Sequence, residues 1–155
     1  PIGRPAMNLG TDLLLLRQAL EELAAARRHL DFSATRVSAL PADLKGVSDA
    51  QLESAEAYTS RFARTVDLLV NKVLRGIDRV ELRPSGTLLD VINSAEQRGL
   101  VERAEALREM KAMRNEVAHD YAGQRLPEVF AFCRERKVLL DAICDRAAEH
   151  ARRFR

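Results

Sequence analysis

The chain has 155 residues, of which 46% are hydrophobic and 31% charged, and this profile is typical of one globular domain. No apolar run approaches the roughly 20 residues that a helix needs to cross a bilayer, so we expect a soluble, cytoplasmic protein without a membrane anchor. The formal net charge of +2 is too small to indicate nucleic-acid binding by itself. Only four of the 25 basic residues are lysines, and although arginine suits phosphate, a GC-rich genome explains the same bias.

The two ends of the chain and its cysteines give few further clues. Residues 1–7 lack the apolar core of a signal peptide, so we interpret them as a cloning remnant or disordered leader before a single domain at 8–155. Cys133 and Cys144 are separated by about 16 Å along one predicted helix, too far for a disulfide. We therefore expect two reduced, buried thiols.

The first half of the chain predicts two helices. Apolar residues three and four positions apart place the first at about 11–31. Ser48 and Gln51 then form the signature of a capping box. The apolar pattern continues from there for seven turns and predicts one helix at 48–79, which must pack against partners along its full length.

The second half predicts three shorter helices. The first covers about 87–97 and stops at Gly99, a residue that favours a left-handed helix terminus. The next starts near Leu100 and ends at Gly123, and the last spans 126–152 with a proline in its first turn. No alternation typical of strands occurs, so the prediction is an all-α bundle of four to five helices.

One charged residue interrupts the apolar face of the fourth predicted helix. The stripe passes through Leu107 and Met110, and steps of four and three then lead to Arg114 and Val117. An unpaired charge among apolar side chains is strongly unfavourable. We therefore expect Arg114 to be paired, to extend its guanidinium to solvent, or to face a cleft or a second subunit.

His119 adds a second constraint. Five residues after Arg114 it lies about 140° further round a straight helix, so the two side chains cannot meet there. Either the helix unwinds just before Gly123 and lets His119 turn inward, or each residue meets its counterpart from another copy across a two-fold axis. The second alternative predicts a homodimer with its site at the interface.

The stretch from Arg114 to Tyr121, RNEVAHDY, reads R-x-x-x-x-H-x-Y and resembles the signature of HEPN domains (higher eukaryotes and prokaryotes nucleotide-binding). More specifically, it is similar to the HepT-type toxins of HEPN/MNT toxin–antitoxin pairs, a type II/VII-like system. The resemblance extends over residues 8–150, because the predicted bundle has a long second helix and carries the motif shortly before the last one.

This resemblance implies a metal-independent endoribonuclease that works as a homodimer and needs no cofactor. Arg114 would stabilise the charge that develops on the phosphate, and His119 would transfer protons near neutral pH. Asn115 and Asp120 would support them. Tyr121 matches the residue to which the cognate MNT-type nucleotidyltransferase antitoxin transfers AMP, and this adduct would block the site.

Other interpretations of the same residues stay open. Alone, Arg114 fits a solvated charge paired with Glu109, Glu116 or Asp120, while His119 fits a helix C-terminal residue and Tyr121 a core residue. The chain could then be a non-catalytic nucleotide- or partner-binding subunit of a minimal nucleotidyltransferase, or a helical adaptor with an accidental motif. No metal site is expected, because the remaining histidines lack a ligand at helical spacing.

Overall fold

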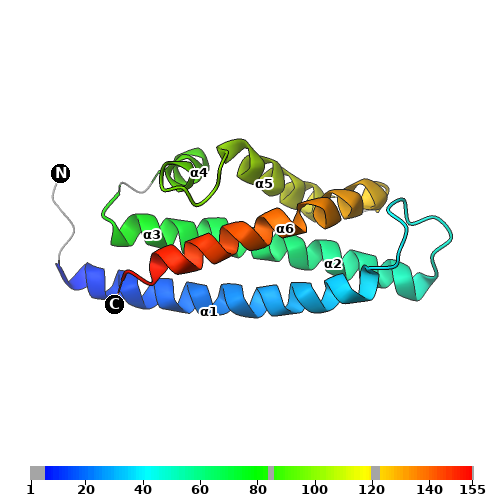
Figure 1. Ribbon diagram of the computed structural model, residues 1–155, viewed down its shortest axis with the longest axis horizontal. Helices are drawn as coiled ribbons and strands as arrows, with labels where there is room; N and C mark the ends of the chain where they lie inside the picture. Colours follow the sequence, from blue (N-terminus) through cyan, green and yellow to red (C-terminus); the bar gives the residue numbers. More distant parts are fainter. Residues whose placement is uncertain (1–5, 84–85, 120–122, 155) are drawn as a thin grey trace.

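The computed structural model describes residues 6–83, 86–119 and 123–154, and all regular structure in those ranges is helical. The described chain forms five helices, the second of which is assembled from three segments (Figure 1). The elements are α1 (Ala6–Val37), α2 (Asp49–Asp67), the π-helical segment η1 (Leu68–Leu74), α3 (Arg75–Val80), α4 (Leu88–Gln97), α5 (Ala104–His119) and α6 (Leu126–Ala151). The all-α prediction is therefore confirmed for this part of the chain.

Helix α1 is longer than predicted at both ends. It continues past residue 31 because Leu30, Ser33 and Val37 follow one another at helical spacing and all three are buried. Because serine is polar, Ser33 interrupts the apolar pattern, and the predicted end of this helix was therefore too early. The start at Ala6 overlaps the leader predicted at 1–7, whose first five residues lie outside the described part of the chain.

The long second helix is confirmed, and so is its capping box. The side chain of Ser48 accepts a hydrogen bond from the backbone nitrogen of Gln51 at 3.1 Å, and Gln51 accepts one from the backbone nitrogen of Ser48 at 2.8 Å. The seven-residue π-helical turn of η1 was not predicted. Such turns widen a helix locally and occur often at functional sites.

The connection from α4 to α5 is tight. Gly99 has a positive φ of 76°, and the backbone nitrogens of Gly99 and Leu100 bond to the carbonyls of Glu96 and Ala95, which completes a left-handed helix terminus. Leu100 and Val101 are buried in this connection, so α5 starts at Ala104 instead of the predicted Leu100. The terminator predicted at Gly99 is confirmed.

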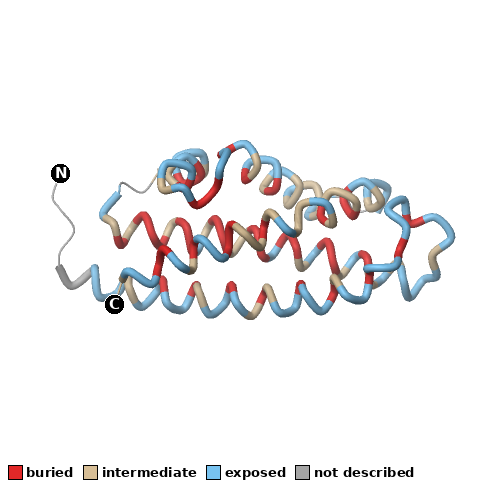
Figure 2. Tube along the Cα trace, in the orientation of Figure 1, coloured by how far each residue is buried: buried red, intermediate tan, exposed pale blue. Residues whose placement is uncertain are grey.

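The core lies along α2, which packs against α1, α5 and α6. Buried positions recur along one side of each long helix (Figure 2). Tyr58 and Phe130 meet edge to face with ring centroids 5.8 Å apart. Cys133 and Cys144 are free, fully buried thiols, as predicted, and burial raises the pKa of each to about 12. Among the described helices, none is both long and apolar enough to cross a membrane.

Candidate functional site

Arg114 lies where the apolar face of α5 opens to solvent. Leu107 and Met110 are fully buried, whereas the Arg114 side chain is 35% exposed and Val117 is half-buried. A groove of about 300 Å³ lies between α5 and α2 at this point. Its lining residues are Ser60, Ala63, Arg64, Asp67, Arg114, Val117 and Ala118.

The anionic partner of Arg114 comes from α2. Nε of Arg114 lies 3.6 Å from Oδ1 of Asp67, and the same oxygen accepts hydrogen bonds from Lys111 Nζ at 2.5 Å and Asn71 Nδ2 at 2.8 Å. Asp67 is the last residue of α2, directly before the π-helical turn, and Asn71 lies within that turn. The turn therefore contributes to holding the carboxylate that faces Arg114.

Among the described residues, none of the nearby acidic side chains that the sequence suggested as partners forms an ion pair with Arg114. Glu109 pairs with Arg136 of α6, and Glu116 pairs with Arg125 before α6. Asp120 lies outside the described residues. Asp67 is 47 positions away from Arg114, and no local pattern in the sequence indicates such a pairing.

The groove retains donors for an anion. A separation of 3.6 Å is too long for a hydrogen bond, and within the described chain neither Nη atom of Arg114 has a hydrogen-bond partner. Arg64 lines the opposite wall, and its side chain also has no hydrogen bond or ion pair to a described residue. The groove is thus lined by two guanidinium groups and one carboxylate, and Lys111 is bonded to that carboxylate, so the excess of positive charge favours the binding of an anionic group.

His119 does not share this groove. It is exposed, and α5 remains helical as far as His119, so the unwinding that would turn it toward Arg114 is absent. Asn115 is also exposed, and at four residues' spacing it lies beside His119 on the outer face of α5. Within one chain the histidine thus points about 140° away from the arginine. Tyr121, the remaining motif residue, falls outside the described part.

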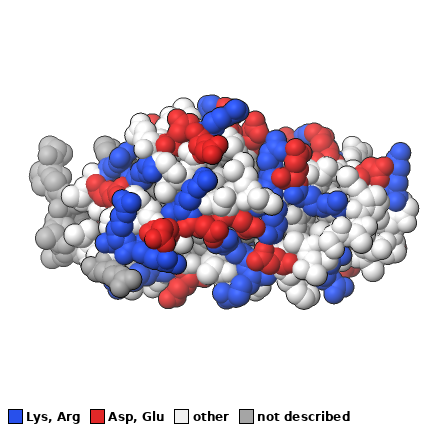
Figure 3. All heavy atoms as spheres, in the orientation of Figure 1, with Lys and Arg blue, Asp and Glu red and all other residues white. Residues whose placement is uncertain are grey.

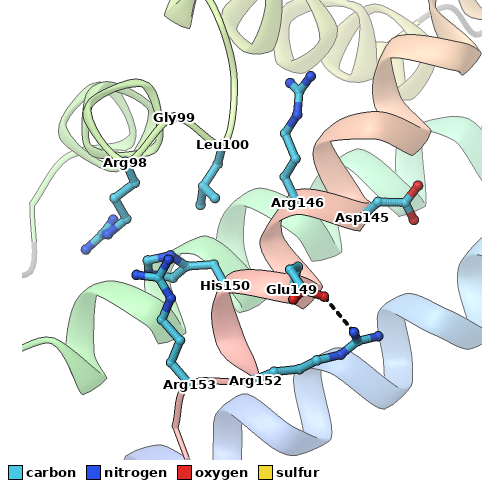
Figure 4. Close-up of a pocket in the computed structure, with 9 residues that line it drawn as sticks. All are labelled: Arg98, Gly99, Leu100, Asp145, Arg146, Glu149, His150, Arg152 and Arg153. Atoms are coloured by element: carbon cyan, nitrogen blue, oxygen red, sulfur yellow. Dashed lines mark hydrogen bonds and ion pairs between the residues drawn. The ribbon is translucent and has the colours of Figure 1, made fainter.

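A larger cavity of about 650 Å³ lies at the other end of α6 (Figure 4). Arg98, Gly99 and Leu100 form one side, and the last turns of α6 with the residues after them form the other. Arg152 is paired with Glu149 at 2.6 Å. About 30 Å of α6 separates this cavity from the end of α5.

On the face of the molecule drawn in Figure 3, the described acidic and basic side chains are interspersed.

A buried ion-pair network lies beside this second cavity. Arg98, whose side chain is only 4% exposed, donates from Nη1 to Asp78 and from Nε to Glu81, both at 2.6 Å. The other oxygen of Glu81 lies 2.9 Å from Nε2 of His150. Burial alone would raise the pKa of Glu81, but the hydrogen bonds from His150 and Arg98 hold it below its usual value. The network joins α4 and α6 to the end of α3, and sequence reasoning did not find it.

Comparison with protein-family models, with curated proteins and with solved structures gave no match for the chain. Among the described residues, no group of three or more His, Cys, Asp or Glu side chains is placed to hold a metal ion.

Proposed function

We propose that the chain is an RNA-cleaving toxin of the HEPN/MNT kind, with its active site at the Arg114 groove. The observation that carries this proposal is the position of Arg114. A motif arginine stands at the edge of the core of an all-helical bundle, in an open groove, with both Nη groups available among the described residues. An arginine with only a structural role would more typically be held by two close hydrogen bonds, as Arg98 is.

The proposed reaction needs no metal ion. The 2′-hydroxyl of the ribose gives its proton to a neutral imidazole of His119, and its oxygen attacks the adjacent phosphorus. The bond from phosphorus to the 5′-oxygen then breaks, and the leaving oxygen takes up the proton that this imidazole accepted. The products are a 2′,3′-cyclic phosphate and a 5′-hydroxyl end. Arg114 stabilises the additional negative charge on the phosphate oxygens, and Asn115 orients the phosphate or the imidazole.

Two copies of the chain are required by this scheme. Arg114 and His119 of one chain diverge by about 140° around α5, so the arginine of one copy has to work with the histidine of another. A two-fold axis near the end of α5 would bring both pairs to one cleft. The proposal thus includes a homodimer whose interface contains the catalytic residues.

Tyr121 provides the proposed means of control. Transfer of AMP from a cognate nucleotidyltransferase to its hydroxyl would add a phosphate to a residue that follows Arg114 by seven positions in the chain. The adduct would compete for the guanidinium and obstruct the cleft. Intact mass of the protein, produced with and without an adjacent nucleotidyltransferase, tests this by the gain of AMP units.

A second candidate function is a non-catalytic, nucleotide- or partner-binding subunit of a nucleotidyltransferase. One observation favours it: Arg114 is paired with Asp67, and among the described residues no second catalytic group of the same chain faces it. The same groove would then hold a phosphate without cleaving its ester.

The deciding experiment measures RNA cleavage by purified protein. Arg114→Ala and His119→Ala should each abolish cleavage and relieve growth arrest, whereas Arg108→Ala should leave both unchanged. Arg108 is a suitable control because it lies on the exposed face of the same helix, and its described ion pair is with Glu105 of that helix. If purified wild-type protein cuts no RNA at any ratio to its partner, the non-catalytic function replaces the enzymatic one.

Mixing the two inactive variants tests the shared site directly. In a mixed dimer of Arg114→Ala and His119→Ala, one of the two arginine–histidine pairs is intact. Random exchange makes half of the dimers mixed, so up to about one quarter of the wild-type activity should return. Absence of any recovery, despite demonstrated exchange of subunits, contradicts the pairing across the dimer.

A further inference from the structure

Phe32 is an exposed aromatic residue on the long helix α1. Its relative exposure of 59% makes it the only exposed aromatic residue in the described part of the chain. It belongs to the last turns of α1, beyond the end predicted from the sequence. The ring therefore adds little to the core and is available to a ligand.

The ring lies in a groove of about 200 Å³ between α1 and α2, with an arginine from each helix beside it. The guanidinium carbons of Arg36 and Arg61 lie 5.7 Å and 6.0 Å from the ring centroid. The groove is lined by Phe32, Ser33, Arg36, Glu53, Ser54, Ala57 and Arg61. Both contacts are within the range of cation–π attraction.

The two arginines differ in how firmly they are held. Nη1 of Arg61 donates to the Ser33 hydroxyl at 2.8 Å and to the His29 carbonyl at 3.1 Å, so its guanidinium is fixed before any ligand arrives. Arg36 is exposed, and its side chain has no hydrogen bond or ion pair to a described residue. It can therefore leave the ring and follow a ligand while Arg61 stays in place.

Helix α2 connects this groove to that of Arg114. Arg61 lies beside Phe32, and Arg64, about one turn later and about 60° away around α2, lines the Arg114 groove. The α2 residues that line the two grooves are displaced by about 10 Å along the helix axis. Each groove also has one acidic lining residue, which is Glu53 in the Phe32 groove and Asp67 in the Arg114 groove. A short oligonucleotide could span both grooves, whereas a single nucleotide could occupy only one.

We propose that Phe32, Arg36 and Arg61 form a base-stacking site for single-stranded RNA, whose backbone continues across Arg64 to the Arg114 groove. An aromatic ring beside guanidinium planes is a common means of binding unpaired bases with little sequence preference. The RNA path rests on the proposed function for its end at Arg114, whereas the stacking site itself can be tested without cleavage.

The first test uses the absence of tryptophan from the chain. Phe32→Trp introduces the only tryptophan of the chain at the stacking position, where its fluorescence can be excited apart from that of the two tyrosines, and a short single-stranded RNA with 2′-O-methyl riboses serves as an uncleavable probe. We expect saturable quenching of the fluorescence by this RNA. Val138→Trp, at a position on α6 that is 79% exposed, should show none. Equal response of both variants, or no quenching of Phe32→Trp, overturns the proposal.

The second test measures affinity for the same RNA by anisotropy. Phe32→Ala should weaken binding by about 5- to 150-fold, which corresponds to the roughly 1–3 kcal/mol contributed by one aromatic stacking partner, and Phe32→Tyr should restore it. Leu14→Ala, at another exposed apolar position of α1 (54%), is the matched control and should bind as wild type does. An abasic RNA of equal length should bind wild type and Phe32→Ala equally. An unchanged affinity of Phe32→Ala for this RNA contradicts the proposed stacking site.

The outcomes separate this proposal from the enzymatic one. If wild type cuts no RNA but quenching and the Phe32 effect are present, cleavage is wrong and the stacking site stands. If Arg114-dependent cleavage is found while Phe32→Ala binds and cuts as wild type does, only the stacking site fails. If free AMP quenches Phe32→Trp as effectively as the oligonucleotide, the site accepts mononucleotides and the continuous RNA path is wrong.

Discussion

Removing the buried Arg98 should destabilise the fold more than removing any exposed arginine. Arg98→Met keeps most of the aliphatic side chain but removes the guanidinium that bridges Asp78 and Glu81. The Asp78 carboxylate, 7% exposed, would then be a buried charge without its counter-ion. Breaking a buried ion pair from one side typically costs about 3–5 kcal/mol.

Two features place the expected loss near the lower end of that range. Glu81 is 25% exposed and can be solvated partly by water, and Nη2 of Arg98 is buried without an acceptor among the described residues. We therefore expect a loss of about 3 kcal/mol in the free energy of unfolding. In a chain of this size it corresponds to a fall of roughly 6–12 °C in Tm.

Urea unfolding followed by circular dichroism measures this difference. The control is Arg108→Met, which removes an exposed pair with Glu105, both side chains being 49% exposed, and should change stability by less than about 1 kcal/mol. The double variant Arg98→Met, Asp78→Asn should be more stable than the sum of the single losses predicts, because no uncompensated charge remains at Asp78. A loss below about 1 kcal/mol for Arg98→Met would refute the buried-charge reasoning.

Four further predictions concern single groups. Gly99→Ala should lower the free energy of unfolding by about 1–2 kcal/mol in urea titrations, because alanine is strained at a φ of 76°; an unchanged value contradicts this. Asp67→Asn should strengthen binding of uncleavable RNA by about two- to fivefold in anisotropy titrations, and weaker binding would show that Asp67 positions Arg114 instead. The folded-state pKa of Glu81 lies below its ordinary value of 4.5. The ionised carboxylate therefore stabilises the fold above pH 4.5, and this stabilisation is lost as the pH falls through the folded-state pKa. Glu81→Gln should therefore lose less stability on acidification than wild type, as urea titrations on both sides of pH 4.5 would show. Cys133 and Cys144 should not react with a chromogenic disulfide reagent at neutral pH until the chain unfolds, because burial raises their pKa values to about 12.

Local features of the fold could be predicted from the sequence because their partners are close in the chain. The capping box at Ser48 involves residues three apart, and the helix terminus at Gly99 depends on one conformational preference. The anomalous position of Arg114 was also visible, since it interrupts a regular stripe. The ion pair of Arg114 with Asp67 could not be predicted, because Asp67 belongs to another helix.

Interactions between distant residues explain what the sequence did not predict. Arg98 precedes a terminating glycine and reads as an ordinary cation at the end of a helix, yet its partner Asp78 is 20 positions earlier and buried. Phe32 lay past the predicted end of α1 and attracted no interpretation, because nothing near it in the chain shows that Arg61 of α2 faces the same ring. The homodimer and the role of Tyr121 stay predictions.

The π-helical turn after Asp67 makes the chemistry of the Arg114 groove depend on chain length as well as on side chains. A π-turn accommodates about one residue more than the α-helix does. Deleting one residue within 68–74 would let an unbroken α-helix form with both halves of the long helix close to their present orientation. Inserting one further residue there, taken up as α-helix, would instead rotate the preceding half by about 100° relative to the rest. Asp67 and Arg64 would then leave the groove together, although neither had been substituted.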